Sequence, residues 1–114
     1  MTEHNRHSEA PGKAGRTSER LLAKTLGARA QPASGALEGA KGDIELPAFL
    51  LEAKSTTQKS MALQLQWLAK IAGEARSIGK PPAVAITFTR PDGHPLLDGE
   101  WVAIPLYTFK ELLT

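Results

Sequence analysis

Two long stretches of the chain carry apolar residues at helical spacing. The first covers about residues 18–26, where Thr17 or Ser18 is the expected N-cap and Gly27 is placed to end the helix. The second, over about 58–77, is the longest predicted element, and its apolar stripe consists of Met61, Leu65, Leu68, Ala72 and Ala75. A stripe of this kind faces a protein core, so we expect both helices to pack against the rest of the domain.

Short apolar runs between and after these helices have the length of β-strands. They lie at residues 43–46, 48–54, 83–89 and 101–106, and a short closing helix follows at 107–113. Turn-forming residues over 90–100 indicate a hairpin-like excursion. Because a strand, a long helix and a strand follow one another between 48 and 89, we expect a right-handed crossover that makes the two strands parallel or nearly parallel neighbours. The pattern therefore predicts a small α/β sandwich with a mixed central sheet flanked by helices.

The first 16 residues differ in composition from the rest of the chain. After Met1 they contain no aliphatic residue larger than Ala, and they mix Gly, Pro, Ser, His and both charges. Such a segment contributes little to a core, so we expect a disordered arm over 1–16 and a single domain over 17–114. A chain of 114 residues is large enough for one modest core.

Composition limits the chemistry and the location of the protein. The chain has no cysteine, which excludes disulfides and zinc binding by thiolates and fits a reducing, cytoplasmic setting. No apolar run approaches the roughly 20 residues of a membrane helix, and the N-terminus lacks the apolar core of a signal peptide, so no membrane association is expected. The formal charge is +2. If several acids are gathered in a metal site, the remaining surface is distinctly basic, as a phosphate-backbone binder requires.

Three ionisable residues lie beside or within the apolar strand at 48–54. Successive side chains of a strand point to opposite faces, so Glu52 and Lys54 share one face. The preceding strand opens with Asp43, which can bring a second carboxylate to the same point. Two carboxylates and a backbone carbonyl, such as that of Ala53, are enough to seat Mg²⁺, which prefers oxygen ligands and keeps several waters. With Lys54 to orient the attacking water, this is an arrangement for metal-assisted phosphodiester hydrolysis.

A third carboxylate is expected on the inward face of the first helix. On a helical wheel Glu19 lies with Leu22 and Leu26, in the apolar stripe. This position is consistent with a site residue, and equally with an acid that the helix dipole favours in a first turn. The Glu52–Lys54 pair also has an ordinary interpretation, because a surface salt bridge at a strand end contributes at most about 1 kcal/mol.

At these residues the chain resembles the PD-(D/E)XK nuclease superfamily and, within it, the archaeal-type and phage Holliday junction resolvases. The likeness runs from about residue 18 to residue 113. The matching segments are Glu19 in SERLL, Ser34-Gly35, Gly42-Asp43-Ile44, LLEAK with Glu52 and Lys54, QLQWLAKIAGEA, AVAITF and WVAIPL. Two features depart from the family. Gly42 replaces the family's Pro before the Asp, which leaves the metal ligand in place, and the sheet looks abbreviated around Pro47.

The resemblance implies a restriction-endonuclease-like fold and a homodimeric, Mg²⁺-dependent endonuclease, with Mn²⁺ as a substitute metal, in the cytoplasm of a bacterial, archaeal or phage-infected cell. Its substrate would be branched double-stranded DNA, recognised by shape and nicked in opposing strands. The implied metal ligands are Asp43, Glu52, the Ala53 carbonyl and Glu19, and Lys54 completes the catalytic set. Restriction enzymes and repair nucleases share this core. A less structure-specific phage or mobile-element nuclease is therefore an alternative, as is a non-catalytic DNA-binding module.

Further residues are candidates for contact with DNA. They are Arg29, Ser34, Gly35, Lys41, Lys59 and Gln64. The basic residues among them could neutralise phosphates, which positions DNA without reading its sequence, although each is equally explained as plain surface charge. The Ser-Gly segment could approach a phosphate through its backbone. The glutamine lies where related nucleases often place a polar residue toward the site. Three aromatic residues are most simply core or interface residues: Trp67, Trp101 and Tyr107.

Overall fold

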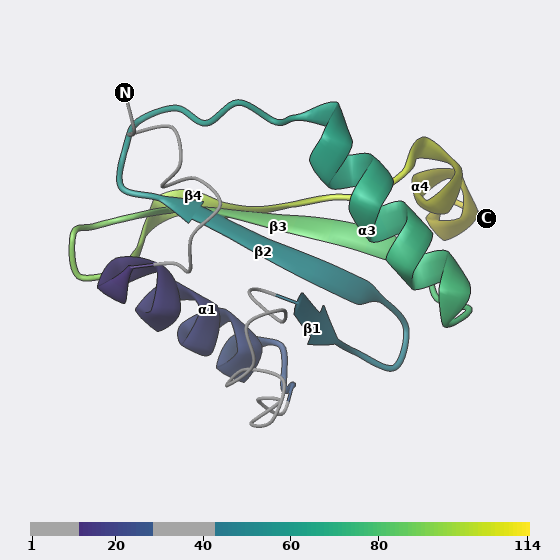
Figure 1. Ribbon diagram of the computed structural model, residues 1–114, viewed down its shortest axis with the longest axis horizontal. Coiled ribbons are helices and arrows are strands. Elements are labelled where there is room, and N and C mark those ends of the chain that lie inside the picture. Colours follow the sequence, from purple (N-terminus) through teal and green to yellow (C-terminus); the bar gives the residue numbers. More distant parts are fainter. Residues whose placement is uncertain (1–11, 29–42) are drawn as a thin grey trace.

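The computed structural model of the protein describes residues 12–28 and 43–114. These residues form an α/β structure in which a four-stranded mixed sheet is flanked by helices (Figure 1). The helices are α1 (Lys13–Thr25), α3 (Leu65–Ser77) and α4 (Leu106–Leu112), and the strands are β1 (Asp43–Glu45), β2 (Leu50–Thr56), β3 (Pro82–Thr89) and β4 (Pro95–Ala103). The predicted α/β class, with a mixed sheet between helices, is confirmed.

The strands lie side by side in chain order, β1–β2–β3–β4. β1 is antiparallel to β2, β2 is parallel to β3, and β3 is antiparallel to β4. Helix α3 connects the two parallel strands, so the predicted crossover between parallel neighbours is confirmed. The last strand begins earlier than the predicted residue 101. The Arg90 N–H donates to the His94 carbonyl (2.8 Å) and closes a tight turn, which allows β4 to start at Pro95.

Alternate residues of β2 face two different hydrophobic layers. Leu51 packs with Leu22 of α1 and with Ala83 in one core cluster. Leu50 points the other way and packs with Ile71 of α3 in a second cluster. Figure 1 accordingly shows α1 and α3 on opposite sides of the sheet. The sheet is therefore the middle of three layers, and each side chain of β2 can be assigned to the α1 side or the α3 side.

Helix α1 begins earlier than the sequence pattern predicts. The predicted N-cap, Thr17 or Ser18, is wrong: α1 starts at Lys13, and Gly12 is its N-cap residue, without a side-chain cap hydrogen bond. The last part of the arm predicted over 1–16 is therefore helical, whereas residues 1–11 lie outside the described part of the chain.

Tertiary packing explains the early start of α1. The first turns of the helix lie against the turn between β3 and β4, where a Cβ atom on Gly93 would stand only 2.5 Å from the Ala14 carbonyl oxygen. This close contact supports helical residues that have no apolar periodicity of their own, so a sequence pattern cannot reveal it. At the other end Gly27 adopts a positive φ of 72° just after the helix, as predicted for a residue that ends it.

Helix α3 is shorter than its predicted counterpart over 58–77. It begins at Leu65, after Gln64 in an extended conformation (φ −91°, ψ 137°). The residues between β2 and α3 connect the end of the strand to the helix layer, so they are not helical. A helix of 13 residues is about 20 Å long, which matches the length of the strands that it covers. Met61 therefore precedes the helix, and the buried stripe centres on Ile71. None of the helices in the described part of the chain is long and apolar enough to cross a membrane.

Candidate functional site

The centre of the candidate site is a pair of carboxylates on neighbouring strands. Asp43 of β1 is the direct partner of Glu52 of β2 in the antiparallel ladder. Residues directly opposite each other in such a ladder have Cβ atoms about 5 Å apart and project to the same face. Because residues two apart in a strand share a face, this is the face of Leu50, which packs against α3. The structure thus brings together the two acids that the sequence pattern pairs.

Lys54 lies on the same face, two residues beyond Glu52. Its Nζ is 3.4 Å from Glu52 Oε2 and 4.3 Å from the centroid of the Trp67 ring. The ammonium is therefore held between a carboxylate and the face of an aromatic ring, and a cation–π contact of this kind is worth about 0.5–2 kcal/mol. Since Glu52 is only 6% exposed, the pair is sheltered more than an ordinary surface ion pair. Trp67 contributes a defined position for Lys54 that the sequence pattern does not predict.

Helix α3 adds a third carboxylate, that of Glu74. Its side chain lies close enough to Asp43 to repel it when both are ionised and to share a hydrogen bond with it when one is protonated. Lys70, one turn earlier, pairs with Glu74 at 2.9 Å, and this hydrogen bond raises the pKa of Lys70. In the sequence these two residues look like an ordinary surface i,i+4 pair. The available signal is their position in the sequence, because Lys70 directly precedes Ile71 and Glu74 directly precedes Ala75, the two buried residues of the helix.

The environment of Asp43 raises the pKa of its side chain. Burial raises the pKa of Asp43 to about 6, and repulsion by Glu74 and Glu52 acts in the same direction, whereas Lys70 lowers it. A hydrogen bond that protonated Asp43 can donate to the Glu74 side chain contributes a further increase in this pKa. Perturbation by burial together with neighbouring charges is typical of functional sites. Burial is therefore the main cause of the raised pKa of Asp43, and the neighbouring carboxylates add to it.

Two oxygen atoms of the site are buried without a hydrogen-bond partner among the described residues. They are Oε1 of Glu52 and Oε1 of Glu74. A buried acceptor left unsatisfied costs about 1–3 kcal/mol, and more when it is charged. A bound cation, or water held by one, removes this cost because a carboxylate oxygen is a preferred ligand of hard divalent metals. The orphan oxygens therefore fit a cation site better than a closed ion-pair network.

The three carboxylates do not form a complete set of metal ligands in the geometry that the structure shows. Within residues 12–28 and 43–114, no three His, Cys, Asp or Glu side chains are arranged to hold a metal ion as they stand. Mg²⁺ is usually bound by one or two carboxylates and keeps several waters, so it does not need a full set of protein ligands. The donor set of Asp43, Glu52 and Glu74 consists of hard oxygens and suits Mg²⁺ or Mn²⁺ in kind.

Two other predicted ligands have different positions. Glu19 lies on α1, whose buried Leu22 packs on the Leu51 side of the sheet, whereas Asp43 and Glu52 project to the opposite side. The structure therefore does not place the backbone of Glu19 in the layer of the other two acids. Ala53 lies in β2 between the two site side chains, just beyond the ladder pairs that β1 makes with β2, so its carbonyl is at the edge of the site.

The predicted DNA-contact residues are only partly described. Arg29, Ser34, Gly35 and Lys41 lie outside the described residues. Lys59 is exposed in the bend that follows β2, which agrees with a surface cation. Gln64 is exposed and precedes α3 as its N-cap residue, so the prediction that it lies within the helix is wrong. The extended backbone at this position explains the difference.

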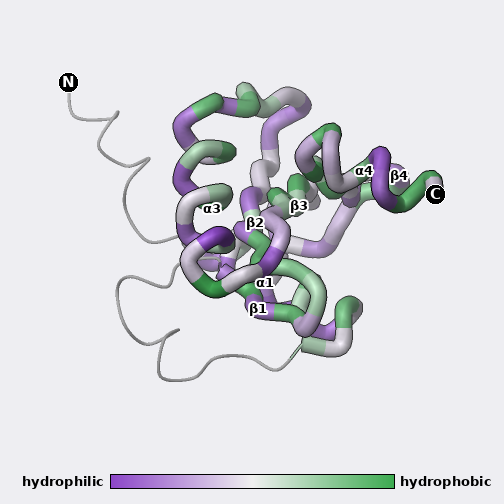
Figure 2. The backbone as a smooth tube through the Cα atoms, turned by 90° about the vertical axis from the view of Figure 1, so that its right-hand side faces the viewer, coloured by the Kyte–Doolittle hydropathy of each residue, from purple (hydrophilic) through white to green (hydrophobic). Residues whose placement is uncertain are grey.

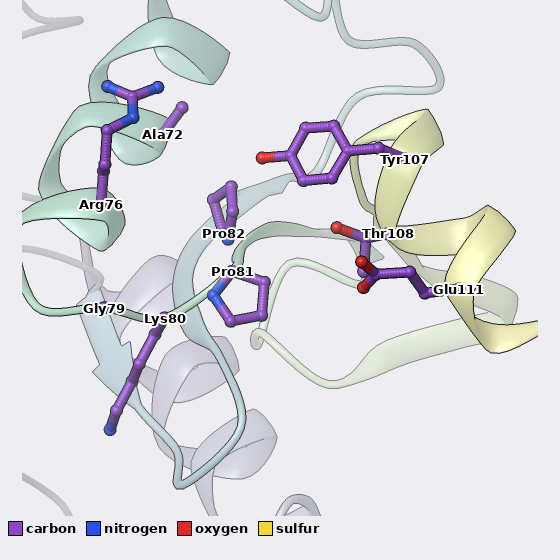
Figure 3. A pocket seen from close by; sticks show the side chains of 9 residues that line it. All are labelled: Ala72, Arg76, Gly79, Lys80, Pro81, Pro82, Tyr107, Thr108 and Glu111. Atoms are coloured by element: carbon purple, nitrogen blue, oxygen red, sulfur yellow. The ribbon is translucent and has the colours of Figure 1, made fainter.

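A shallow pocket lies elsewhere, between the end of α3, the start of β3 and α4. Its volume is about 330 Å³, and its lining includes Arg76, Lys80, Tyr107 and Glu111 (Figure 3). Lys80 extends away from it and places its Nζ 2.7 Å from both Glu45 Oε2 and the Leu46 carbonyl oxygen. None of the residues lining this pocket belongs to the carboxylate cluster, so we do not assign the candidate chemistry to it.

Comparison with protein-family models, with curated proteins and with solved structures finds no match for this chain.

Proposed function

We propose that the protein is a Mg²⁺-dependent endodeoxyribonuclease with a PD-(D/E)XK type of site and a restriction-endonuclease-like fold. The observation that carries this proposal is the direct pairing of Asp43 with Glu52, with Lys54 on the same sheet face. The orphan oxygen of Glu52 supports it, because it leaves a hard ligand available beside a cationic side chain. The sheet order, with antiparallel β1 and β2 followed by a parallel crossover to β3, is compatible with the proposed fold.

Each residue of the site has a chemical role in this proposal. Asp43 and Glu52, with the Ala53 carbonyl, would hold the metal, and Glu74 would offer a further oxygen from α3. A divalent cation held there stabilises the charge that develops on a phosphodiester in its transition state. The Lys54 ammonium, fixed by Glu52 and Trp67, would orient the attacking water or donate to a phosphoryl oxygen. Mn²⁺ would substitute for Mg²⁺, since both accept carboxylate ligands.

We propose that the protein is a resolvase and that its preferred DNA substrate is the four-way junction. The basis for this assignment is the order of its sequence motifs. The +2 formal charge is consistent with this substrate class, because three of the 12 acidic residues are gathered at one site and leave the rest of the surface more basic. A resolvase nicks paired strands and therefore acts as a homodimer. A nuclease with a looser structural preference would use the same site on linear, flap and single-stranded DNA.

The decisive experiment incubates the purified protein with labelled four-way junction, flap, linear duplex and single strand, with Mg²⁺ or with EDTA. We expect Mg²⁺-dependent cutting that is strongest on the junction. Asp43→Asn and Lys54→Met should each lower the rate by at least about 100-fold. Asp92→Asn is the matched control, because Asp92 is an exposed acid in the turn between β3 and β4, away from the site.

The outcomes separate the proposals. Equal cutting of all four substrates would refute the resolvase assignment and leave the nuclease. Absence of metal-dependent cutting of any substrate would refute the enzyme. Should Lys54→Met leave every activity unchanged, the 3.4 Å contact with Glu52 is a structural ion pair, and DNA binding without cleavage becomes the better description.

A further inference from the structure

Large apolar side chains are concentrated on β4 and α4, and they are exposed. Thirteen large hydrophobic residues of the described chain are exposed, and nine of them lie on or beside these two elements: Leu96, Leu97, Trp101, Val102, Leu106, Tyr107, Phe109, Leu112 and Leu113. Val102 pairs with Ala85 and projects to the α1 side of the sheet, whereas Trp101 pairs with Ile86 and projects to the α3 side, against which α4 also lies. We call the set without Val102 the β4–α4 apolar surface. Figure 2 shows the labels of β4 and α4 next to each other at one side of the molecule, near the C-terminus. Single exposed apolar residues are normal, but a concentration of this kind indicates an interface.

Packing within the described residues does little to explain why helix α4 is stable. It has seven residues, and Thr108 is the one that is buried within it. Isolated helices of this length are unstable in water, because most helical stability in proteins comes from a covered apolar face. Tyr107 extends across the shallow pocket toward Pro82 and gives α4 one anchor (Figure 3), yet it is still 61% exposed. The remaining apolar face of the helix is open.

The surface is of the size that a specific interface covers. An aromatic side chain buries roughly 150–250 Å² when it is covered, so Trp101, Tyr107 and Phe109, which are 50–63% exposed, present on the order of 300 Å². Five aliphatic side chains, with Leu97 92% exposed, extend this area toward the roughly 800 Å² that each partner contributes to a standard interface. Monomers rarely leave contiguous apolar patches of more than a few hundred Å² open to water.

The position of the surface favours a second copy of the chain as its occupant. β4 and β1 are the two edges of the sheet, so the surface lies at the far edge from Asp43. Packing two copies through β4 and α4 covers both apolar surfaces at once and leaves both carboxylate sites accessible. Pairing of the β4 edges themselves is disfavoured, because Asp98 adopts a positive φ of 58° and the ladder with β3 is shifted between Thr87 and Thr89.

We infer that the protein forms a two-fold symmetric dimer in which the β4–α4 apolar surface of one copy packs, through its side chains, against the same surface of the other. This inference names the dimer face for the proposed nuclease, but it does not require nuclease activity. It is measured without DNA or metal, so its failure and the failure of the proposed function can be told apart.

The test is the mass of the full chain in solution as a function of concentration, by light scattering and sedimentation velocity. We expect twice the 12.2 kDa of one chain at micromolar concentration. Leu97→Lys and Phe109→Lys, singly and together, should weaken dimerisation at least about tenfold, because each places a charge in the interface. Leu65→Lys is the control, since Leu65 is 78% exposed but lies on α3, outside the surface.

Two outcomes would overturn the inference. One is a monomer of wild type at all accessible concentrations. The other is a dimer that Leu65→Lys disrupts while Leu97→Lys and Phe109→Lys do not. Circular dichroism and thermal unfolding distinguish a folded monomer from a variant that fails to fold.

A labelling experiment that introduces no charge gives a second measurement. The chain has no cysteine, so Leu112→Cys carries a single thiol. Its alkylation should slow as the protein concentration rises, whereas that of Leu65→Cys should not. Equal rates for the two thiols at every concentration would also contradict the inference.

Discussion

Asp43 on β1 lies directly opposite Glu52 on β2, so two carboxylates share one sheet face, and Glu74 of α3 adds a third. This relationship concentrates negative charge in a partly buried place. The structure compensates for it only in part, through Lys54 and Lys70, and two buried carboxylate oxygens have no partner among the described residues. We therefore expect the candidate site to destabilise the metal-free protein.

Removal of the Asp43 charge should therefore stabilise the metal-free protein. The pKa of Asp43 rises from 3.8 in the unfolded chain to about 6 in the folded state, so between these values the folded state binds more protons and stability falls as pH rises. Above pH 6 the loss is complete. Full linkage of this shift corresponds to roughly 3 kcal/mol, and solvent reduces it because Asp43 is only partly buried. In EDTA at pH 8 we therefore expect Asp43→Asn to increase the free energy of unfolding by at most about 2 kcal/mol, with little gain at pH 4. Urea unfolding at the two pH values measures both numbers.

The matched control for this experiment is Asp92→Asn. The backbone N–H of His94 donates to Asp92 and lowers the pKa of that carboxyl, so its ionised form is favoured by folding. Replacement of Asp92 should not stabilise the protein at pH 8. An Asp43→Asn variant that is no more stable than wild type at pH 8 would show that the Asp43 charge is well solvated.

The sequence predicts the site residues that lie on the strands and misses Glu74 on α3, for a physical reason. Strand alternation places Glu52 and Lys54 on one face, and a ladder partner such as Asp43 follows from the short connection between two strands. Helical periodicity marks Glu19 as inward, yet it does not tell which side of the sheet the helix covers. The same limitation hides Glu74, because its approach to Asp43 depends on how α3 is placed across the strands.

Metal binding should reverse the destabilisation. If Mg²⁺ binds Asp43 and Glu52 in the folded state alone, it stabilises the protein by about 2.7 kcal/mol at a concentration 100 times its Kd. We expect the midpoint of thermal unfolding to rise with Mg²⁺ for wild type and to stay constant for Glu52→Gln. The Asp92→Asn variant should respond as wild type does. A metal response that persists in Glu52→Gln would place the metal elsewhere.

Glu74 and Lys70 should move the acidity of Asp43 in opposite directions. Glu74 repels the ionised form of Asp43 and shares a hydrogen bond with it, whereas Lys70 attracts that form. In the metal-free protein we expect Glu74→Gln to lower the pKa of Asp43 from about 6 toward its ordinary value and Lys70→Met to raise it. An NMR titration of the Asp43 carboxyl carbon measures both changes. Shifts of the same sign in the two variants would contradict the arrangement.

Trp67 should act on catalysis through the position of Lys54. The ring lies 4.3 Å from Lys54 Nζ, so its removal takes away one of the two contacts that hold the ammonium and changes no proposed ligand of the metal. We expect Trp67→Leu to lower kcat about tenfold and to leave KM nearly unchanged, because a cation–π contact of about 0.5–2 kcal/mol is lost. Trp67→Phe keeps an aromatic face and should retain most of the activity. Equal losses in both variants would indicate that Trp67 supports the fold and not Lys54.

Two glycines offer the same chemical change with opposite expected effects on stability. Gly93 has a positive φ of 93°, and a Cβ there would stand 2.5 Å from the Ala14 carbonyl oxygen and 2.7 Å from Thr17 Cβ. Gly93→Ala should therefore destabilise the protein by about 2 kcal/mol or more and loosen α1, as hydrogen exchange of its amides would show. Gly73 lies within α3 with open space around it, so Gly73→Ala should stabilise by about 1 kcal/mol. A Gly93→Ala variant as stable as wild type would mean that α1 does not pack against the β3–β4 turn, and the early start of the helix at Lys13 would then lose its physical explanation.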